Sequence, residues 1–172
     1  MSETYFIDGY NLLHFSPEWK ALADDDLEAA REALVDFVAR WCDASGHTAR
    51  IFFDGRARQT STAQLAAHLS RVEVVFSSHH KSADSIIERG VYDAKDRESI
   101  MVVSADRGIL DLCRGMGAMT MRPDFFLDSA KGGVDTFSHR LRQRKRDGKF
   151  GSIEEHLDED QRKHIDELRD GL

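Results

Sequence analysis

Four aspartates stand where predicted strands end or where the following helices begin, and their carboxylates could together bind a divalent cation. Asp8 and Asp54 each follow a short apolar run and precede a glycine. Asp84 and Asp106 each come shortly after such a run, at the start of a predicted helix. Mg²⁺ and Mn²⁺ prefer oxygen ligands, and Mg²⁺ typically keeps several waters that can serve as nucleophile or proton carrier. These residue types therefore favour metal-assisted attack of water on a phosphodiester.

Taken singly, each aspartate has a structural explanation. Aspartate at a helix N-terminus is commonly a cap, which would account for Asp84 or Asp106. Asp-Gly after a strand is commonly a turn, which would account for Asp8 or Asp54. The metal-site hypothesis depends on the conjunction, because four strand ends of one domain carry the same acidic residue.

The elements that must position these aspartates alternate along the first two thirds of the chain. Strands are predicted at 5–7, 50–53, 72–76, 99–103 and 118–121, the last ending before Pro123. Helices are predicted at 26–43, 62–69, 83–93 and 107–114, with a loop over residues 14–25. This order predicts a three-layer α/β/α domain with a mainly parallel, five-stranded sheet. Ligands of such sheets bind outside the carboxyl ends of the strands, and all four aspartates are expected at that edge.

Composition sets limits on the class of protein. The chain has 172 residues, 41% hydrophobic and 32% charged, as expected of one soluble domain. No apolar run approaches the length of a membrane span, and no signal peptide precedes the first strand, so we expect a cytoplasmic protein without membrane contact. Cys42 and Cys113 are expected to be buried free thiols. The net charge of −7 argues against nucleic-acid binding by bulk charge, although a local basic groove is compatible with it.

The last part of the chain differs in charge pattern from the rest. We predict a domain over residues 1–132 and a helical extension over 133–172, basic at first and acidic from residue 152 onward. The basic run could follow an RNA backbone, or it could be a solvated helix face that pairs with the acidic segment. Its candidate RNA-binding residues are Arg140, Arg142, Arg144 and Lys145.

The aspartate motifs resemble those of the NYN domains, which belong to the PIN-like nuclease group. Ile7-Asp8-Gly9-Tyr10-Asn11 is similar to the opening signature of that family. The segments 53–55, 82–84 and 103–106 follow in the order and at roughly the spacing seen there. Chain length and the form of the first motif are most similar to the YacP-like branch. The resemblance covers residues 4–131 and implies a PIN-like, Rossmann-like fold.

The same resemblance implies a function. It implies a metal-dependent endoribonuclease with Mg or Mn as cofactor, and cleavage of messenger RNA in connection with translation. Single-stranded mRNA would then be the substrate and the ribosome a conceivable partner. By position, Asp8, Asp84 and Asp106 would be metal-site acids, Asn11 their polar partner, and Asp54 a further acidic position.

Several polar residues near the motifs keep two interpretations. Asn11 could orient a metal-bound water or phosphate, or it could cap the segment after the first motif. Basic residues beside the aspartates could hold phosphate or be ordinary surface charges. These basic candidates are Arg56, Lys81 and Arg107.

Three other classes of protein remain open. A haloacid-dehalogenase-like phosphatase also carries aspartates at strand ends, but it needs a second aspartate two residues after the first, where this chain has Tyr10. A non-catalytic RNA-binding PIN-like module would have a decayed site, whereas all four acids are present. In a purely structural α/β domain the acids would only cap helices and form turns. The oligomeric state, the number of metals and the RNA target do not follow from the sequence.

Overall fold

The computed structural model describes residues 3–55, 69–77 and 82–132. The chain divides into two compact units, Met1–Val134 and Asp135–Leu172, and the second lies outside the described residues. The predicted extension and its boundary at residue 132 therefore stay predictions. The predicted helix over 62–69 also lies almost entirely outside the described residues. The same holds for the RNA-binding candidates Arg56, Lys81, Arg140, Arg142, Arg144 and Lys145.

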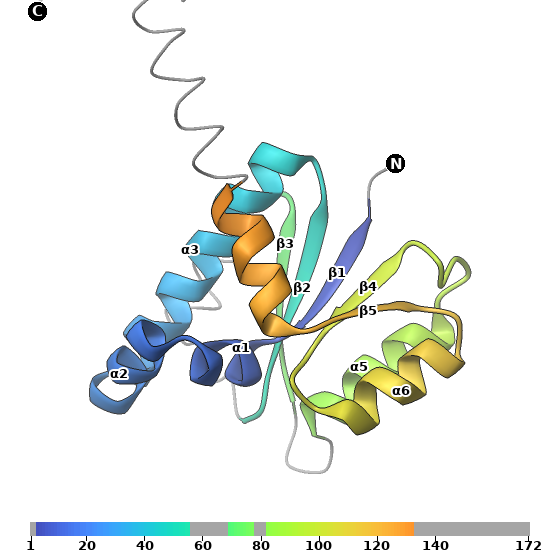
Figure 1. Cartoon of the computed structure of the whole chain (residues 1–172), viewed down its shortest axis with the longest axis horizontal. Helices are drawn as coiled ribbons and strands as arrows, with labels where there is room; N and C mark the ends of the chain where they lie inside the picture. The colour runs from blue at the N-terminus through green and yellow to red at the C-terminus, as the bar shows by residue number, and fades with distance from the viewer. Residues whose placement is uncertain (1–2, 56–68, 78–81, 133–172) are drawn as a thin grey trace, which may run out of the picture. The chain divides into compact units, whose positions relative to one another are not determined.

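Five parallel strands form one sheet in the order β3-β2-β1-β4-β5 (Figure 1). Their bounds are β1 Thr4–Asp8, β2 Thr48–Phe53, β3 Val72–Phe76, β4 Ile100–Val103 and β5 Met119–Met121. The central strand is β1, where Ile7 pairs with Ile51 on one side and Val103 on the other. The chain extends the sheet first to one side of β1 and then to the other, so the strand order reverses between β1 and β4. The carboxyl ends of strands at such a reversal are where open α/β sheets bind ligands.

Helices cover both faces of the sheet, as the alternating strand pattern predicts (Figure 1). Successive strand residues point to opposite faces, so Ile7 and Phe6 belong to different cores. The first core is covered by α1 Gly9–Phe15, α2 Pro17–Asp25, α3 Leu27–Ser45 and a helix over 123–132. The second is covered by α5 Ala83–Asp93 and α6 Arg107–Gly115. The predicted three-layer α/β fold is confirmed.

One prediction about local structure is wrong, and one helix was not predicted, for the same reason. Residues 14–25, predicted as a loop, contain the end of α1 and all of α2, which begins at Pro17. A further helix over 123–132 begins at Pro123, where the sequence indicates only the end of a strand. Proline is well suited to the first turn of a helix, because its φ is already helical and its missing N–H would have no partner there.

The predicted Asp-Gly turn after the first strand is also wrong. Asp8 is the last residue of β1 and the N-cap of α1, so Gly9 begins a helix. A Cβ on Gly9 would lie 2.3 Å from Cε1 of Phe53, so the packing of α1 against β2 requires glycine. Gly55 does adopt a positive φ of 121°, as a turn after β2 would need.

Two further expectations concern the chain's environment. Cys42 and Cys113 are buried free thiols, as predicted, and burial raises the pKa of Cys42 to about 12. In the described part of the chain, no helix combines the length and the hydropathy that a membrane crossing requires.

Candidate active site

Asp84 lies within electrostatic reach of Asp8, Asp54 and Asp106 at the carboxyl edge of the sheet, and Asp8 also lies within reach of Asp54. Burial raises the pKa of Asp8, and the carboxylates of Asp84 and Asp54 raise it further. Burial likewise raises the pKa of Asp84, with added contributions from Asp106 and Asp54. Like charges raise a carboxyl pKa only over short range. The fold thus places Asp84 next to the other acids, while none of these interactions links Asp8 with Asp106.

Asp8 is the most rigidly held of these acids. Its side chain is 5% exposed and accepts a hydrogen bond from the backbone N–H of Asn11 at 3.0 Å. The side-chain amide of Asn11 donates a second hydrogen bond to the other carboxylate oxygen. Both bonds favour the charged carboxylate and oppose the rise of the Asp8 pKa that burial causes. Asn11 is thus neither a cap nor free, because it orients the Asp8 carboxylate.

Asp54 joins the end of β2 to the start of α5. One carboxylate oxygen accepts a bond from the backbone N–H of Ala83 at 2.6 Å and another from Oγ of Ser77 at 3.1 Å. Ser77 is 6% exposed, and its hydroxyl also accepts a bond from the backbone N–H of Gly55. Ser77 fixes both the turn after β2 and the Asp54 carboxylate. In the sequence, the one sign of this role is that Ser77 directly follows the third strand.

Asp106 and Asp84 differ although both stand at helix starts. Asp106 is the N-cap of α6, and its carboxylate accepts a hydrogen bond from the backbone N–H of Gly108 at 2.7 Å. The backbone N–H of Asp106 in turn donates to Oγ of the buried Ser104. The cap of α5 is Ser82, which accepts from the N–H of Ser85. Asp84 accepts no hydrogen bond from the described residues. The capping interpretation is therefore correct for Asp106 and wrong for Asp84.

These residues suit a hard divalent cation in kind, although not as a closed cage. Within the described residues, no three His, Cys, Asp or Glu side chains lie close enough to hold one ion directly. Mg²⁺ commonly takes one or two carboxylates and fills its remaining positions with water. Asp8 and Asp84 fit that role, since Asp8 is preoriented and Asp84, beside like charges, accepts no hydrogen bond from the described residues. Asp54 and Asp106 each give one oxygen, Oδ1, to a helix N-terminus, and would contribute to the ion through water with the other oxygen.

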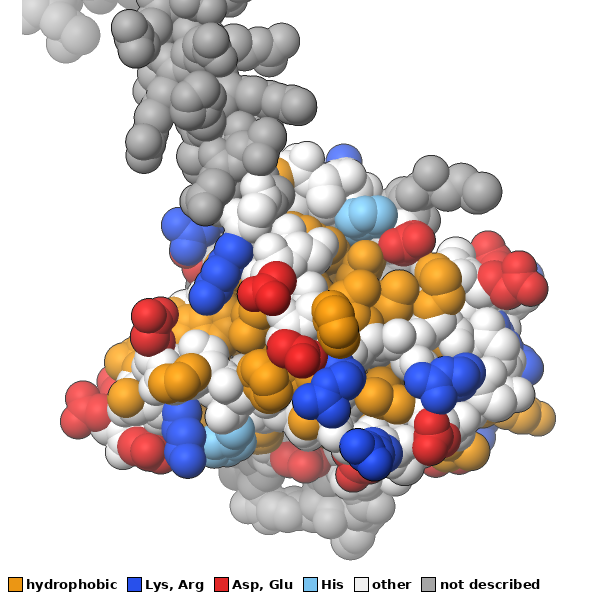
Figure 2. Space-filling view, in the orientation of Figure 1, with side chains coloured by type: hydrophobic (Ala, Val, Ile, Leu, Met, Phe, Trp, Pro, Cys, Tyr) orange, Lys and Arg blue, Asp and Glu red, His pale blue; other side chains and the backbone are white. Residues whose placement is uncertain are grey.

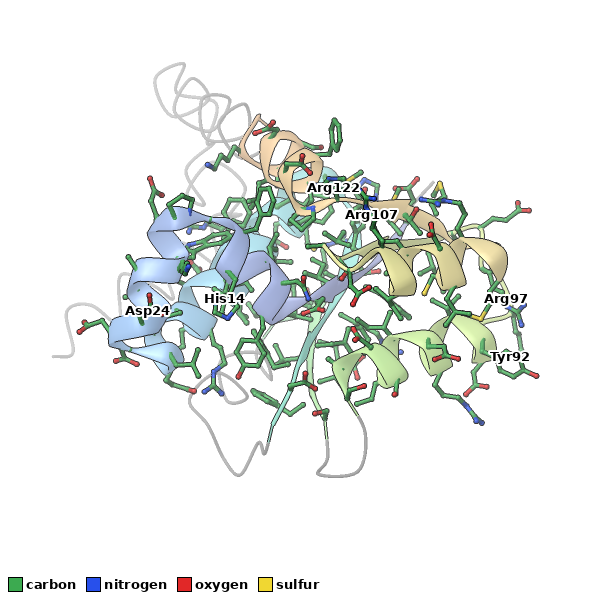
Figure 3. All side chains as sticks on the ribbon, turned by 60° about the horizontal axis from the view of Figure 1, so that its bottom comes forward. His14, Asp24, Tyr92, Arg97, Arg107 and Arg122 are labelled. Atoms are coloured by element: carbon green, nitrogen blue, oxygen red, sulfur yellow. The ribbon has the colours of Figure 1, made fainter. Side chains whose placement is uncertain are left out.

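Two arginines carry positive charge near this edge. Arg107 is exposed and follows Asp106 at the start of α6, and Arg122 directly follows β5 (Figure 3). Arg122 pairs with Asp124 at 3.3 Å. On the face shown in Figure 2, acidic and basic side chains are interspersed, and the described residues form no continuous basic stripe there.

Tyr10 borders the acids and packs in the core rather than standing free. Its ring meets that of Phe53 edge to face at 5.2 Å, and Phe53 contacts Phe76 at 5.5 Å. Burial raises the Tyr10 pKa, Arg31 lowers it, and Asp54 and Glu28 add to the rise. Arg31 thus reaches the site from α3. Its spacing from Glu28 resembles an ordinary helix ion pair, so the sequence does not single it out.

Parallel strands with helices on both faces, and acids at their carboxyl edge, are the architecture of a doubly wound α/β domain, and the family match below assigns it to the nuclease-type, PIN-like class. The family model described as YacP-like NYN domain matches residues 5–170, and the chain belongs to that family. The predicted family is confirmed, but the match extends to residue 170, beyond the residues 4–131 that the motifs cover.

Known relatives agree with this assignment. The chain is 30% identical over 83 residues to the uncharacterized protein YacP of Bacillus subtilis (strain 168), and the alignment covers 48% of each chain. The match thus spans about half the length of that relative. The crystal structure of Rae1 (YacP) from Bacillus subtilis superposes with a TM-score of 0.71 at 23% identity, covering 98% of this chain and 95% of that one. The crystal structure of a single-substitution variant of Rae1 (YacP) superposes with a TM-score of 0.63, covering 96% of this chain and 99% of that one. At this identity the structural likeness shows the fold.

Proposed function

We propose that the chain is a Mg- or Mn-dependent endoribonuclease that cleaves single-stranded RNA. The observation that carries this proposal is that Asp8, where the strand order reverses, lies within electrostatic reach of Asp54 and Asp84, and that Asp84 lies within reach of Asp106. Four carboxylates repel one another, and a bound cation relieves that repulsion. Such an ion, when bound, polarises a phosphodiester and lowers the pKa of its water.

The chain's own residues have distinct roles in this proposal. Asp8 would present a preoriented carboxylate, because Asn11 holds both of its oxygens. Asp84 would be the open acceptor, since the described residues donate no hydrogen bond to it. Asp54 and Asp106 would hold waters on the outer side while keeping the starts of α5 and α6 in place.

Substrate and setting follow from the family resemblance. Messenger RNA as substrate, the ribosome as partner and a cytoplasmic location belong to this proposal on that ground. The basic run near residues 140–145 would add phosphate contacts outside the described residues.

Substitution of Asp8 by asparagine tests the proposal. The asparagine side chain keeps the shape of aspartate and can still accept from the N–H of Asn11, so we expect the fold to persist while Mn²⁺-dependent cleavage of single-stranded RNA is lost. The matched control is Asp93→Asn, an exposed acid at the far end of α5 that pairs with Arg89 at 2.7 Å. Mn²⁺ titration by calorimetry should show a site that Asp8→Asn weakens and Asp93→Asn does not. Unchanged cleavage by Asp8→Asn would refute the assignment.

One observation favours a second function, a non-catalytic RNA-binding module. No three described acidic side chains lie at ligand distance of a common point. A chain of this kind would bind RNA equally well with and without divalent ions and would not cleave it. The same Mn²⁺ titration separates the two functions.

A further inference from the structure

Arg31 differs from the other helix-borne arginine of α3 in its surroundings. The Arg31 side chain is 14% exposed, whereas that of Arg40 is 62% exposed. Arg40 makes a short ion pair with Asp36 at 2.7 Å, as surface arginines often do. Nη1 of Arg31 lies 3.2 Å from Oε2 of Glu28, and the guanidinium carbon lies 5.8 Å from the centre of the Phe76 ring. Arg31 is therefore packed inward and not spread over the helix surface.

The position of Arg31 is set by the fold. Because α3 leads from the carboxyl end of β1 to the start of β2, its first turns lie at the carboxyl edge of the sheet. Phe76 is the last residue of β3 at the same edge. Arg31 also acts electrostatically on Tyr10, the residue that follows the Asp8-Gly9 pair. Arg31, which is ion-paired with Glu28, thus lies on the β3 side of this edge and acts on Tyr10, as Asp54 also does.

The guanidinium has donors left for a ligand. Its Nε donates to the backbone carbonyl of Leu27 at 3.4 Å, and Nη1 lies against Glu28. A guanidinium carries five N–H donors. Within residues 3–55, 69–77 and 82–132, no acceptor contacts Nη2. The stacked ring and the Leu27 carbonyl hold the plane of the group, which leaves a preoriented fork for a phosphate oxygen.

We propose that Arg31 binds a phosphate of the single-stranded RNA substrate and positions the strand against the aspartates, with Tyr10 and Phe76 as the aromatic wall beside it. This inference rests on the proposed nuclease function. An acidic cluster repels an RNA strand, and a permanent cation beside it offsets that repulsion at the place where the strand must enter. Arg31 acts on the strand and not on the reacting atoms, so it is a positioning residue.

The test compares Arg31→Gln, Arg31→Lys and Arg40→Gln in the full chain. Binding of a labelled oligo(U) is measured by fluorescence anisotropy at several salt concentrations with Ca²⁺, and cleavage is measured with Mn²⁺. We expect Arg31→Gln to raise Kd and KM by about 10- to 100-fold, the usual effect of losing a hydrogen bond to a charged group. The slope of log Kd against log salt should fall by about 0.7, one phosphate contact on a single strand.

The two other variants separate charge, shape and stability. Arg40→Gln should bind and cleave like the parent chain. Arg31→Lys keeps the charge, so it should retain the salt slope while losing part of the affinity, and it serves as the test if Arg31→Gln does not fold. A purely structural role for Arg31 would lower Tm and leave the salt slope unchanged.

The outcomes distinguish the two proposals. If the parent chain neither binds nor cleaves oligo(U), the proposed function fails, and the inference fails with it. If the parent chain cleaves and Arg31→Gln keeps the parent's Kd and salt slope, the inference alone is overturned. An equal loss in Arg31→Gln and Arg40→Gln would also overturn it.

Discussion

Asp8 and Asp84 carry the same charge at the same edge of the sheet, but the chain holds them in opposite ways. Asp8 is 5% exposed and receives two hydrogen bonds from Asn11. Asp84 is half-buried and accepts no bond from the described residues, although Asp106 and Asp54 repel it. Folding alone explains the position of Asp8, because the residue caps α1. Nothing in the described part of the fold requires an acid at position 84, so Asp84 is the sharper probe of function.

A loss second only to that of Asp8→Asn is expected for Asp84→Asn. If Asp84 is the open ligand, this change should lower Mn²⁺-dependent RNA cleavage by about 1000-fold, since metal-held charge stabilisation is worth several kcal/mol. The circular dichroism spectrum and the melting transition should persist, because the carboxylate supports no described hydrogen bond. Cleavage rates under single-turnover conditions measure the effect, with Asp93→Asn as the control on the same helix. Full activity in Asp84→Asn would show that Asp84 is not a metal ligand.

A smaller loss is expected for Asn11→Ala. This change removes the side-chain bond to Asp8 and leaves the backbone bond in place. Residues that orient a metal ligand typically contribute about 10- to 100-fold, so we expect a loss of that size in cleavage or Mn²⁺ affinity. Isothermal titration with Mn²⁺ gives the affinity directly. Asn11→Ala with parental Mn²⁺ affinity and activity would show that the Asp8 carboxylate needs no orientation by this amide.

Packing beneath Asp8 is tested by Gly9→Ala. The added Cβ would lie 2.3 Å from Phe53, so either the ring or the start of α1 must move. Overpacking of this kind usually costs about 1–3 kcal/mol in the free energy of unfolding. Urea denaturation measures it, and Gly115→Ala is the control, because a Cβ there meets nothing within 4 Å. Equal free energies of unfolding for the two variants would mean that the Phe53 ring moves aside without destabilising the fold.

The smallest effect concerns pH. Burial raises the folded-state pKa of Asp84 above its ordinary value of 3.8, and Asp106 and Asp54 raise it further. The folded chain therefore binds this proton more tightly than the unfolded chain, and stability falls as pH rises through the interval between the two pKa values. In EDTA, Asp84→Asn should stabilise the chain at pH 7 by about 0.5 kcal/mol, a small value because water screens a half-exposed group.

The pH dependence provides its own control. The gain in Asp84→Asn should vanish below the unfolded-state pKa, where the parent carboxyl is protonated in both states. Thermal melts at about pH 7 and about pH 3 measure the difference, since these values lie on either side of the transition. A gain that does not change with pH would contradict the assignment of this electrostatic cost to Asp84.

Much of this fold and site was open to prediction from the sequence. Buried parallel strands read as continuous apolar runs, which is why β2 and β3 are evident from segments such as 50–53 and 72–76. The helices that begin at Pro17 and Pro123 were not predicted. A proline at a helix start cannot be distinguished by sequence alone from a proline in a loop. Ser77 and Arg31 were not predictable as site residues, since their partners lie on other elements.

The sequence by itself determined which residue types end the strands, and hence that carboxylates gather at one edge of a parallel sheet. It did so because strand direction and helix alternation follow from local apolar periodicity. Only the tertiary structure decided how each acid is held: Asp8 by Asn11, Asp54 by Ser77 and the start of α5, and Asp84 by no hydrogen bond from the described residues. The Asp8–Asn11 contact spans only three residues, but the contacts of Asp54 join strands and helices that are distant in the chain, and such contacts are not encoded in the local pattern of any one segment.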